Sequence, residues 1–178
     1  MHMDIKDTFS WTNSEIEVRD IAKYGRGIFA KNEIKKGEML AVFGGYVMNV
    51  KDEKNNLPDD INDNAVQISE DLVLGIKKES ELEKACYFNH SCNPNAGFRG
   101  QIFLVAMKNI KKDEQVTFDY GTVLFRSKNG IDYQFDCACG KSECRKVITN
   151  NDWKIKKLQQ KYKGYFQHYL EEKINIKK

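Results

Sequence analysis

Three cysteines stand close together near residue 140, in a pattern that suits a metal ion. The spacing is Cys-x-Cys-x4-Cys, over Cys137, Cys139 and Cys144. Thiolates spaced in this way can reach one ion, and zinc prefers a tetrahedral site with sulfur ligands. Free buried thiols are the simpler alternative, but such local crowding disfavours it. The fourth ligand is open at this point, and the candidates are Cys92, Cys86 and His90.

A second group of reactive side chains lies in the segment 87–95, which reads Tyr-Phe-Asn-His-Ser-Cys-Asn-Pro-Asn. A turn rich in asparagine is common in proteins. A histidine, a serine and a cysteine flanked by large apolar residues are harder to explain as a simple turn. The segment therefore predicts buried polar groups that are organised around a ligand or an active site.

Two shorter motifs are weak evidence when each is taken alone. Gly25-Arg26-Gly27 could be an ordinary turn, or it could let a ligand approach the backbone closely because glycine has no side chain. The motif Phe118-Asp119-Tyr120-Gly121 places a tyrosine at the end of a predicted strand, where most tyrosines belong to the core or its rim. Only their context can decide whether either motif has a functional role.

Short strands joined by glycine turns are predicted to position these groups. Alternating apolar and polar residues predict a strand over 16–21. A short helix is predicted over 79–86, and the polar segment 51–64 indicates a surface loop or insertion. Apolar runs predict further strands at 28–30, 39–43, 65–68, 72–74, 102–106 and 115–119.

The C-terminal part of the chain has a different pattern. Aromatic and apolar residues recur there every three or four positions among lysines and glutamines, which predicts an amphipathic helix over 151–178 that packs against the body. Its apolar face would consist of Trp153, Leu158, Tyr162, Tyr165, Phe166, Tyr169 and Leu170.

Composition indicates one soluble, intracellular globular domain with small appendages. The 178 residues suffice for a single core, and 40% of them are hydrophobic and 31% charged. No apolar run is long enough to span a membrane, and the start of the chain lacks the apolar core of a signal peptide. The net charge of +3 is too small to indicate nucleic-acid binding.

Taken together and in order, four motifs resemble a SET domain followed by a post-SET zinc motif. The resemblance covers residues 16–148 and implies a mostly β (β-rich α+β) fold, the SET-domain β-clip fold of short strands with a pseudoknot. It divides the chain into an N-terminal extension (1–15), a SET domain (16–121), a post-SET zinc segment (122–150) and the C-terminal helix (151–178). The motifs are Lys23-x-Gly-Arg-Gly-x-Phe-Ala30, Phe88-Asn-His-Ser-Cys-Asn-Pro-Asn95, Glu114-Gln-Val-Thr-Phe-Asp-Tyr-Gly121 and Cys137-x-Cys-Gly-x3-Cys-Arg145.

The resemblance also implies an activity, which is that of a protein-lysine N-methyltransferase using S-adenosylmethionine, with one structural zinc ion. The substrate would be a lysine in a histone tail or another protein, and no nucleic-acid or membrane partner is expected. Tyr120 would be catalytic, and Tyr87, Phe118 and Tyr120 would line the substrate channel. Cys92 would complete the zinc site with Cys137, Cys139 and Cys144. The cofactor would contact Lys23, Gly25, Arg26, Gly27, Tyr46, Phe88, Asn89, His90, Tyr120 and Ile148.

The implied chemistry explains the aromatic residues. A lysine side chain has a reference pKa near 10.4, so only about one molecule in 2,500 carries a neutral amine at pH 7. An apolar channel favours the neutral amine by desolvation. In the family that the chain resembles, a phenylalanine two residues before the catalytic tyrosine admits more than one methyl group, and the resemblance implies the same for Phe118.

Two other function classes compete with this interpretation. A non-catalytic SET fold would bind peptide or cofactor without turnover, and the intact Asn89, His90 and Tyr120 argue against it. A zinc hydrolase would need an open metal position and a nearby general base, and the cysteine cluster has no adjacent His-Glu pair.

Overall fold

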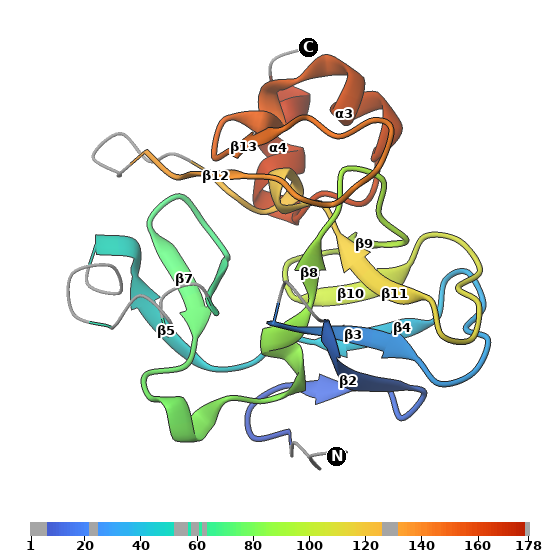
Figure 1. The fold of residues 1–178 in the computed structure, drawn as a ribbon. Coiled ribbons are helices and arrows are strands. Elements are labelled where there is room, and N and C mark those ends of the chain that lie inside the picture. Colours follow the sequence, from blue (N-terminus) through green and yellow to red (C-terminus); the bar gives the residue numbers. More distant parts are fainter. Residues whose placement is uncertain are drawn as a thin grey trace.

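The computed structural model describes residues 7–21, 25–51, 57, 61, 64–125 and 132–176. Short strands dominate these residues, and helical segments are few and short (Figure 1). The strands are β1 (Trp11–Thr12), β2 (Ile16–Ile21), β3 (Gly25–Ala30), β4 (Met39–Val42), β5 (Tyr46–Asn49), β6 (Val66–Gln67), β7 (Leu72–Gly75), β8 (Asn89–His90), β9 (Ala96–Arg99), β10 (Phe103–Ala106), β11 (Gln115–Phe118), β12 (Gln134–Asp136) and β13 (Val147–Thr149). The α-helices are α3 (Lys156–Lys161) and α4 (His168–Ile176), and the 3-10 helices are η1 (Glu79–Glu81), η2 (Lys84–Tyr87), η3 (Tyr120–Thr122) and η4 (Asp152–Lys154).

The strands form four small sheets rather than one large one. Their strand orders are β1-β4-β10-β9, β2-β3-β11-β8, β5-β7-β6 and β12-β13. The first two sheets enclose the main core, in which Ile28, Leu40, Phe98 and Leu104 are fully buried. The strands predicted from the sequence are confirmed. Short apolar runs suit short strands that are buried on at least one face.

The parallel pairing of β8 with β11 brings two of the sequence motifs together. Asn89 pairs with Thr117, and His90 pairs with Phe118. The side chain of Asn95 reinforces the contact, since its oxygen accepts the Thr117 N–H at 3.0 Å and its amide nitrogen donates to the Gln115 carbonyl at 2.8 Å. The segments 88–95 and 115–121 are therefore fixed to each other, as the predicted SET fold requires.

The C-terminal part is helical but discontinuous, so the prediction of one long helix is wrong. It consists of η4, α3 and α4, and the break between the two α-helices contains Gly164, whose φ of 81° does not fit a right-handed helix. The apolar face is nevertheless as predicted, because Trp153, Leu158, Tyr162, Phe166 and Leu170 form a second buried cluster.

Two smaller expectations also differ from the structure. Residues 79–86 contain two separate 3-10 helices, η1 and η2, in place of one short helix. Gly25 to Gly27 open strand β3 and pair with β2, so they are strand residues and not a free turn. Gly25 still has a φ of 73°, which favours glycine. Most of the predicted loop 51–64 lies outside the described residues.

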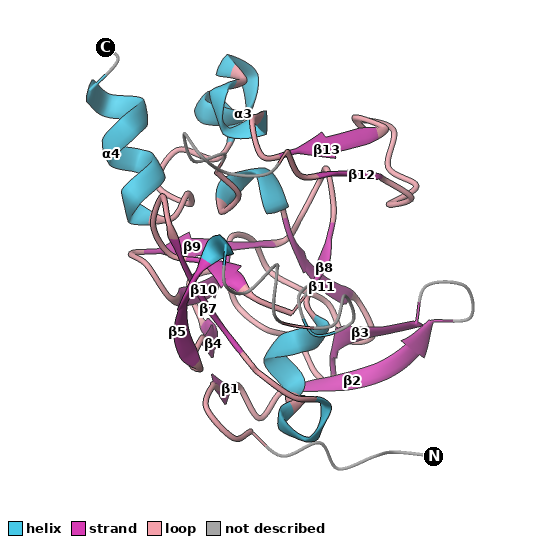
Figure 2. Ribbon diagram, turned by 90° about the vertical axis from the view of Figure 1, so that its left-hand side faces the viewer, coloured by secondary structure: helices cyan, strands magenta, loops and turns pink. Residues whose placement is uncertain are grey.

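Residues 7–12 are bound to the body of the protein. The carboxylate of Glu83, which is 1% exposed, accepts the backbone N–H groups of Thr8, Phe9 and Ser10, and β1 pairs with β4. β1 lies at the opposite end of the molecule from α4 (Figure 2). In the described part of the chain, none of the helices combines the length and apolarity that crossing a membrane requires.

Candidate active site

Tyr120 stands where the two fixed segments meet. Its hydroxyl donates to the Phe88 carbonyl at 3.0 Å, and its backbone N–H donates to His90 Nδ1 at 3.1 Å. The side chain of Asp119 accepts the Gly121 N–H at 2.9 Å, which starts η3 directly after β11. Both ends of the tyrosine residue, the hydroxyl and the backbone, are thus held by the segment 88–90.

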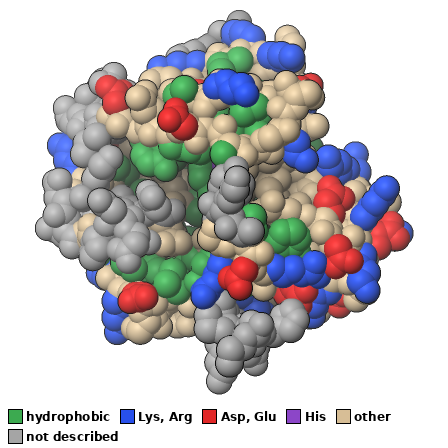
Figure 3. Space-filling view, viewed as in Figure 1, with side chains coloured by type: hydrophobic (Ala, Val, Ile, Leu, Met, Phe, Trp, Pro, Cys, Tyr) green, Lys and Arg blue, Asp and Glu red, His purple; other side chains and the backbone are tan. Residues whose placement is uncertain are grey.

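Aromatic rings surround Tyr120. The Phe118 ring centroid lies 4.9 Å from that of Tyr120, the Phe135 centroid lies 5.8 Å away, and the His90 ring lies 5.3 Å away. Phe118 itself is buried against Phe98. Figure 3 shows hydrophobic side chains gathered around a recess near the middle of one face of the molecule. A ligand group that reached Tyr120 would meet apolar walls and little water.

The beginning of β3 contacts the same region. The Asn89 side chain donates to the Arg26 carbonyl at 2.8 Å. A Cβ atom added at Gly27 would lie 2.8 Å from the side-chain amide nitrogen of Asn89, so any other residue here would force that side chain to shift. The Arg26 guanidinium lies 5.6 Å from the ring centroid of Tyr87 and donates to its hydroxyl at 3.2 Å.

Three predicted cofactor residues differ in their placement. Ile148 of β13 is fully buried and pairs with Phe135 of β12. The ring of Phe135, in turn, contacts the ring of Tyr120. Tyr46 of β5 belongs to another group of contacts, with the ring of Phe9, the ammonium of Lys77 and the carboxylate of Glu81. Lys23 lies outside the described residues. The cofactor contacts of all three stay predictions.

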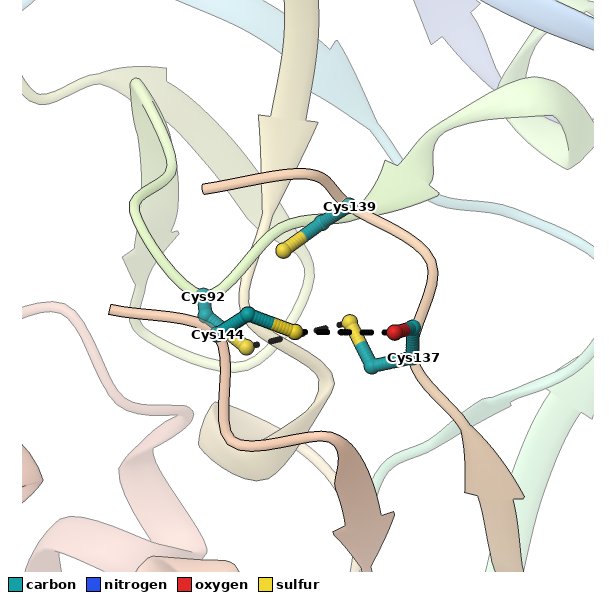
Figure 4. A group of neighbouring side chains, drawn as sticks. All are labelled: Cys92, Cys137, Cys139 and Cys144. Atoms are coloured by element: carbon teal, nitrogen blue, oxygen red, sulfur yellow. Dashed lines mark hydrogen bonds between the residues drawn. The ribbon is translucent and has the colours of Figure 1, made fainter. Parts of the chain in front are cut away.

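The structure brings four cysteines together, and the fourth is Cys92. The sulfur atoms of Cys92, Cys137, Cys139 and Cys144 all lie within 4.8 Å of one another, and they converge on one point from two separate segments (Figure 4). Tetrahedral zinc with Zn–S bonds of 2.3 Å places sulfur atoms about 3.8 Å apart. The distance between the sulfurs of Cys92 and Cys137 is 3.8 Å. Donor type, number and spacing therefore fit zinc.

The other two candidates for the fourth ligand, Cys86 and His90, do not belong to the group of four sulfur atoms. Cys86 lies in η2, outside the cluster of four, and burial raises the pKa of its thiol to about 11. His90 contacts the cluster from its edge, with Nε2 3.3 Å from the Cys92 sulfur. Two backbone N–H groups also point at ligand sulfurs, those of Arg145 to Cys92 and of Lys146 to Cys144. Such donors stabilise thiolate charge.

His90 is neutral in this setting. Burial, assisted by the positive charge of Arg145, lowers the pKa of His90 to about 4, against the opposing pull of Asp119. The 3.7 Å approach of His90 to Asp119 is therefore not an ion pair at neutral pH. Since Nδ1 accepts a backbone N–H from Tyr120, the ring proton of the neutral imidazole is on Nε2, which faces the Cys92 sulfur.

A buried ion pair connects the cysteine cluster to the tyrosine. Arg145 follows Cys144 and donates two hydrogen bonds to Asp119, at 2.6 and 2.7 Å, and a third to Asp152 at 2.9 Å. The Asp119 side chain is 0% exposed. Burial acts against the charged guanidinium, but the hydrogen bonds and charge of Asp119 outweigh it and raise the pKa of Arg145.

Phe135 and Arg145 are absent from the predicted site residues, although the structure places both beside Tyr120 or its neighbour Asp119. Their position in the sequence was the available signal. Phe135 stands two residues before the first cysteine of the cluster, and Arg145 directly follows the last one. When a metal ion fixes the cysteine segment against the site, the residues next to those cysteines also come close to the site.

The fold and the site define a β-rich protein in which a group of four cysteines lies near a partly buried tyrosine. A family model described as "SET domain" matches residues 25–121, more than half of the chain. The chain belongs to the SET domain family. Both the resemblance and the fold class that the sequence predicts are confirmed, and the cysteine cluster is consistent with the post-SET zinc motif.

Similar proteins include histone-lysine N-methyltransferases. The chain is 33% identical over 138 residues to histone-lysine N-methyltransferase ASHH3 of Arabidopsis thaliana, which covers 71% of the chain and 36% of that protein. It is 27% identical over 149 residues to histone-lysine N-methyltransferase ash1 of Drosophila melanogaster, with 77% and 6% coverage. The chain thus spans much less than two thirds of these relatives.

A solved structure of similar fold is that of KRYPTONITE in complex with mCHH DNA, an H3(1-15) peptide and SAH. The TM-score is 0.57 at 23% sequence identity, and the match covers 76% of this chain and 30% of that one. This likeness shows the fold. The molecules bound to KRYPTONITE are properties of that protein.

Proposed function

We propose that the chain is an S-adenosylmethionine-dependent protein-lysine N-methyltransferase. The observation that carries the proposal is the placement of Tyr120, whose hydroxyl is fixed on the Phe88 carbonyl within a shell of aromatic rings. Membership of the SET family and the names of the relatives support the same activity. The predicted site residues are proposed in these roles.

The start of β3 and the segment 88–90 fit the proposed cofactor. A Cβ atom added at Gly25 would meet no described atom within 4 Å, so the backbone there borders open space. The carbonyl of Arg26 and the amide of Asn89 are fixed to each other nearby. S-adenosylmethionine supplies, when bound, a methyl group on a positively charged sulfonium. Polar backbone groups close to apolar side chains suit such a ligand.

The aromatic shell would prepare the lysine. The rings of Phe118, Tyr120 and Phe135 replace water around the side chain, and desolvation favours the neutral amine over the ammonium. The neutral amine has a free lone pair and can attack the methyl carbon in line, so that its new N–C bond forms as the C–S bond breaks. The transferred charge ends on the methylated lysine, which loses a proton to water.

Tyr120 would orient the reacting groups and not take a proton. Its hydroxyl proton is already committed to the Phe88 carbonyl. Its oxygen therefore faces an incoming group as an acceptor, suited to hydrogens of the amine or, more weakly, of the methyl group. Holding reactants in line supplies a large share of the rate in transfer reactions.

The four-cysteine site would have a structural role. Four sulfur ligands close the coordination sphere of zinc and leave no position for water or substrate. When bound, the ion supplies the bond energy that holds residues 137–144 against the segment around Cys92. This arrangement argues against the zinc hydrolase, which needs an open position.

The substrate is proposed to be a lysine in a protein, such as a histone tail, and a location in the cytoplasm or nucleus belongs to the same proposal. Tritiated methyl transfer from S-adenosylmethionine to a histone panel and to a total protein extract tests it. We expect labelling by the wild type and a loss of at least 100-fold in Tyr120→Phe.

A matched control is Tyr169→Phe. Tyr169 also donates its hydroxyl to a main-chain carbonyl, that of Val123, but it lies in the C-terminal cluster. It should retain activity. If the wild type bound S-adenosylmethionine in calorimetry and labelled no protein at all, the chain would instead be a non-catalytic binding module.

A further inference from the structure

Two residues connect the four-cysteine site to Tyr120, one by direct hydrogen bonds and the other through Asp119. The first is His90. One ring nitrogen, Nε2, lies 3.3 Å from the Cys92 sulfur, and the other, Nδ1, accepts the Tyr120 backbone N–H at 3.1 Å. A metal-bound Cys92 is a thiolate and can only accept, so it holds the imidazole proton on Nε2. That leaves Nδ1 free to accept from Tyr120.

The second connection is Arg145. Its backbone N–H donates to the same sulfur of Cys92 at 3.3 Å, and its guanidinium forms the paired bonds to Asp119, the residue before Tyr120. Asp119 also accepts the Gly121 N–H, on the other side of the tyrosine. The carboxylate therefore holds the backbone before and after Tyr120 while Arg145 holds the carboxylate.

This arrangement is specific because the groups involved are buried. The Asp119 side chain is 0% exposed and that of His90 is 4% exposed. A carboxylate so far from water needs a fixed charged partner, and a two-pronged contact from arginine fixes direction as well as charge. Lysine could supply the charge but not the rigid, planar pair of parallel hydrogen bonds.

We propose that His90 and Arg145 are positioning residues that make the placement of Tyr120 depend on the occupied four-cysteine site. The metal site then does more than hold the segment 137–144 in place, because loss of the ion frees both the Cys92 sulfur and Arg145 and so releases the tyrosine backbone. The activity consequence rests on the proposed function, whereas the structural consequence does not.

The direct test is the backbone amide resonance of Tyr120 in protein labelled with 15N-tyrosine, assigned by its absence in Tyr120→Phe. We expect this resonance to shift in His90→Gln and in Arg145→Gln, each measured with one zinc bound per chain. The Tyr46 amide, in a different sheet, is the internal reference and should stay in place. Arg19→Gln removes another ion-paired arginine, bound to Glu17 and Asp113, and should leave both resonances unchanged.

A kinetic readout separates positioning from simple loss of folding. In zinc-loaded Arg145→Gln, kcat should fall by roughly 10- to 100-fold, the range expected for losing hydrogen bonds to a charged group, while the KM for the methyl donor changes less than threefold. Arg145→Lys should recover only part of the loss. If Arg145→Gln fails to fold, His90→Gln decides, because it leaves the buried ion pair intact.

An unmoved Tyr120 amide in the zinc-loaded variants would overturn the proposal, whatever their activity. So would a Tyr120 resonance that is the same in zinc-bound and zinc-free wild type. If the wild type shows no methyl transfer but the amide shifts as expected, the proposed function fails and the coupling between the metal site and Tyr120 stands.

Discussion

An alanine at position 27 would test how tightly the start of β3 is packed against the site. The added Cβ would lie 2.5 Å from Gln115 Nε2, 2.7 Å from Ile21 Cδ1 and 2.8 Å from Asn89 Nδ2. All three distances are shorter than van der Waals contact. Gly27 does not have a positive φ, so the backbone itself accepts alanine and the cost comes from crowding alone.

The magnitude follows from two opposing effects. Overpacking a filled site costs about 1–3 kcal/mol, and replacing glycine by alanine returns about 0.4–1 kcal/mol by restricting the unfolded chain. We expect a net loss of about 0–2.6 kcal/mol in the free energy of unfolding, which lowers Tm by up to roughly 10 °C for a chain of this size. Urea and thermal unfolding at constant zinc measure it.

Gln115 supplies the matched test, because its Nε2 is the nearest obstacle. Truncating that side chain makes room, so Gly27→Ala/Gln115→Ala should be more stable than the sum of the single variants predicts, by at least about 0.5 kcal/mol. Strict additivity in this double-mutant cycle would refute the crowding argument. A Gly27→Ala variant more stable than the wild type would also refute it.

Three further predictions concern the cysteines and the C-terminal cluster. Cys139→Ser should lose the bound zinc while Cys86→Ser keeps one ion per chain, as measured by metal analysis, because only Cys139 belongs to the cluster of four. Cys86 also gives an alkaline signature. Burial raises its pKa from 9.0 to about 11. The contribution of the neutral thiol to the free energy of unfolding is therefore fully present below pH 9 and is lost as the pH rises through 11. Between pH 9 and pH 11 the free energy of unfolding of the wild type should fall by about 3 kcal/mol more than that of Cys86→Ser. Equal losses would contradict the raised pKa of Cys86. Leu170→Ala, at a fully buried position, should cost about 2–5 kcal/mol in urea unfolding, and a cost under 1 kcal/mol would show that the C-terminal cluster is not part of the cooperative unit.

Much of the fold was predictable because short apolar runs leave little choice. Strands such as Ile16–Ile21 and Gln115–Phe118 are indicated by the order of apolar and polar residues within them. The four motifs in order indicate the SET fold. The prediction of one continuous C-terminal helix was wrong, for a physical reason. Periodicity reports which face is apolar, and that face survives the break at Gly164 unchanged. The break was not predictable from its glycine, because a helix interior can also contain a glycine.

The candidate site was predictable only where a residue carries its own chemistry. Cysteine spacing indicates a metal, but spacing alone left Cys92, Cys86 and His90 equal as the fourth ligand. The parallel pairing of β8 with β11 and the position of η2 separate them, and these are long-range facts. Arg145 shows the same limit, since its place after the last cysteine indicates only that it lies near the cluster, and its partner Asp119 is seen only in the structure.

The opposite placement of β1 and α4 bears on how such a domain is built into larger proteins. The relatives that it matches are several times to many times longer than the matched region. Polypeptide joined ahead of β1 would leave from one end of the molecule and polypeptide joined behind α4 from the other. Such a domain can be inserted between two neighbours as a spacer, and neither neighbour needs to cross the face on which the substrate would enter.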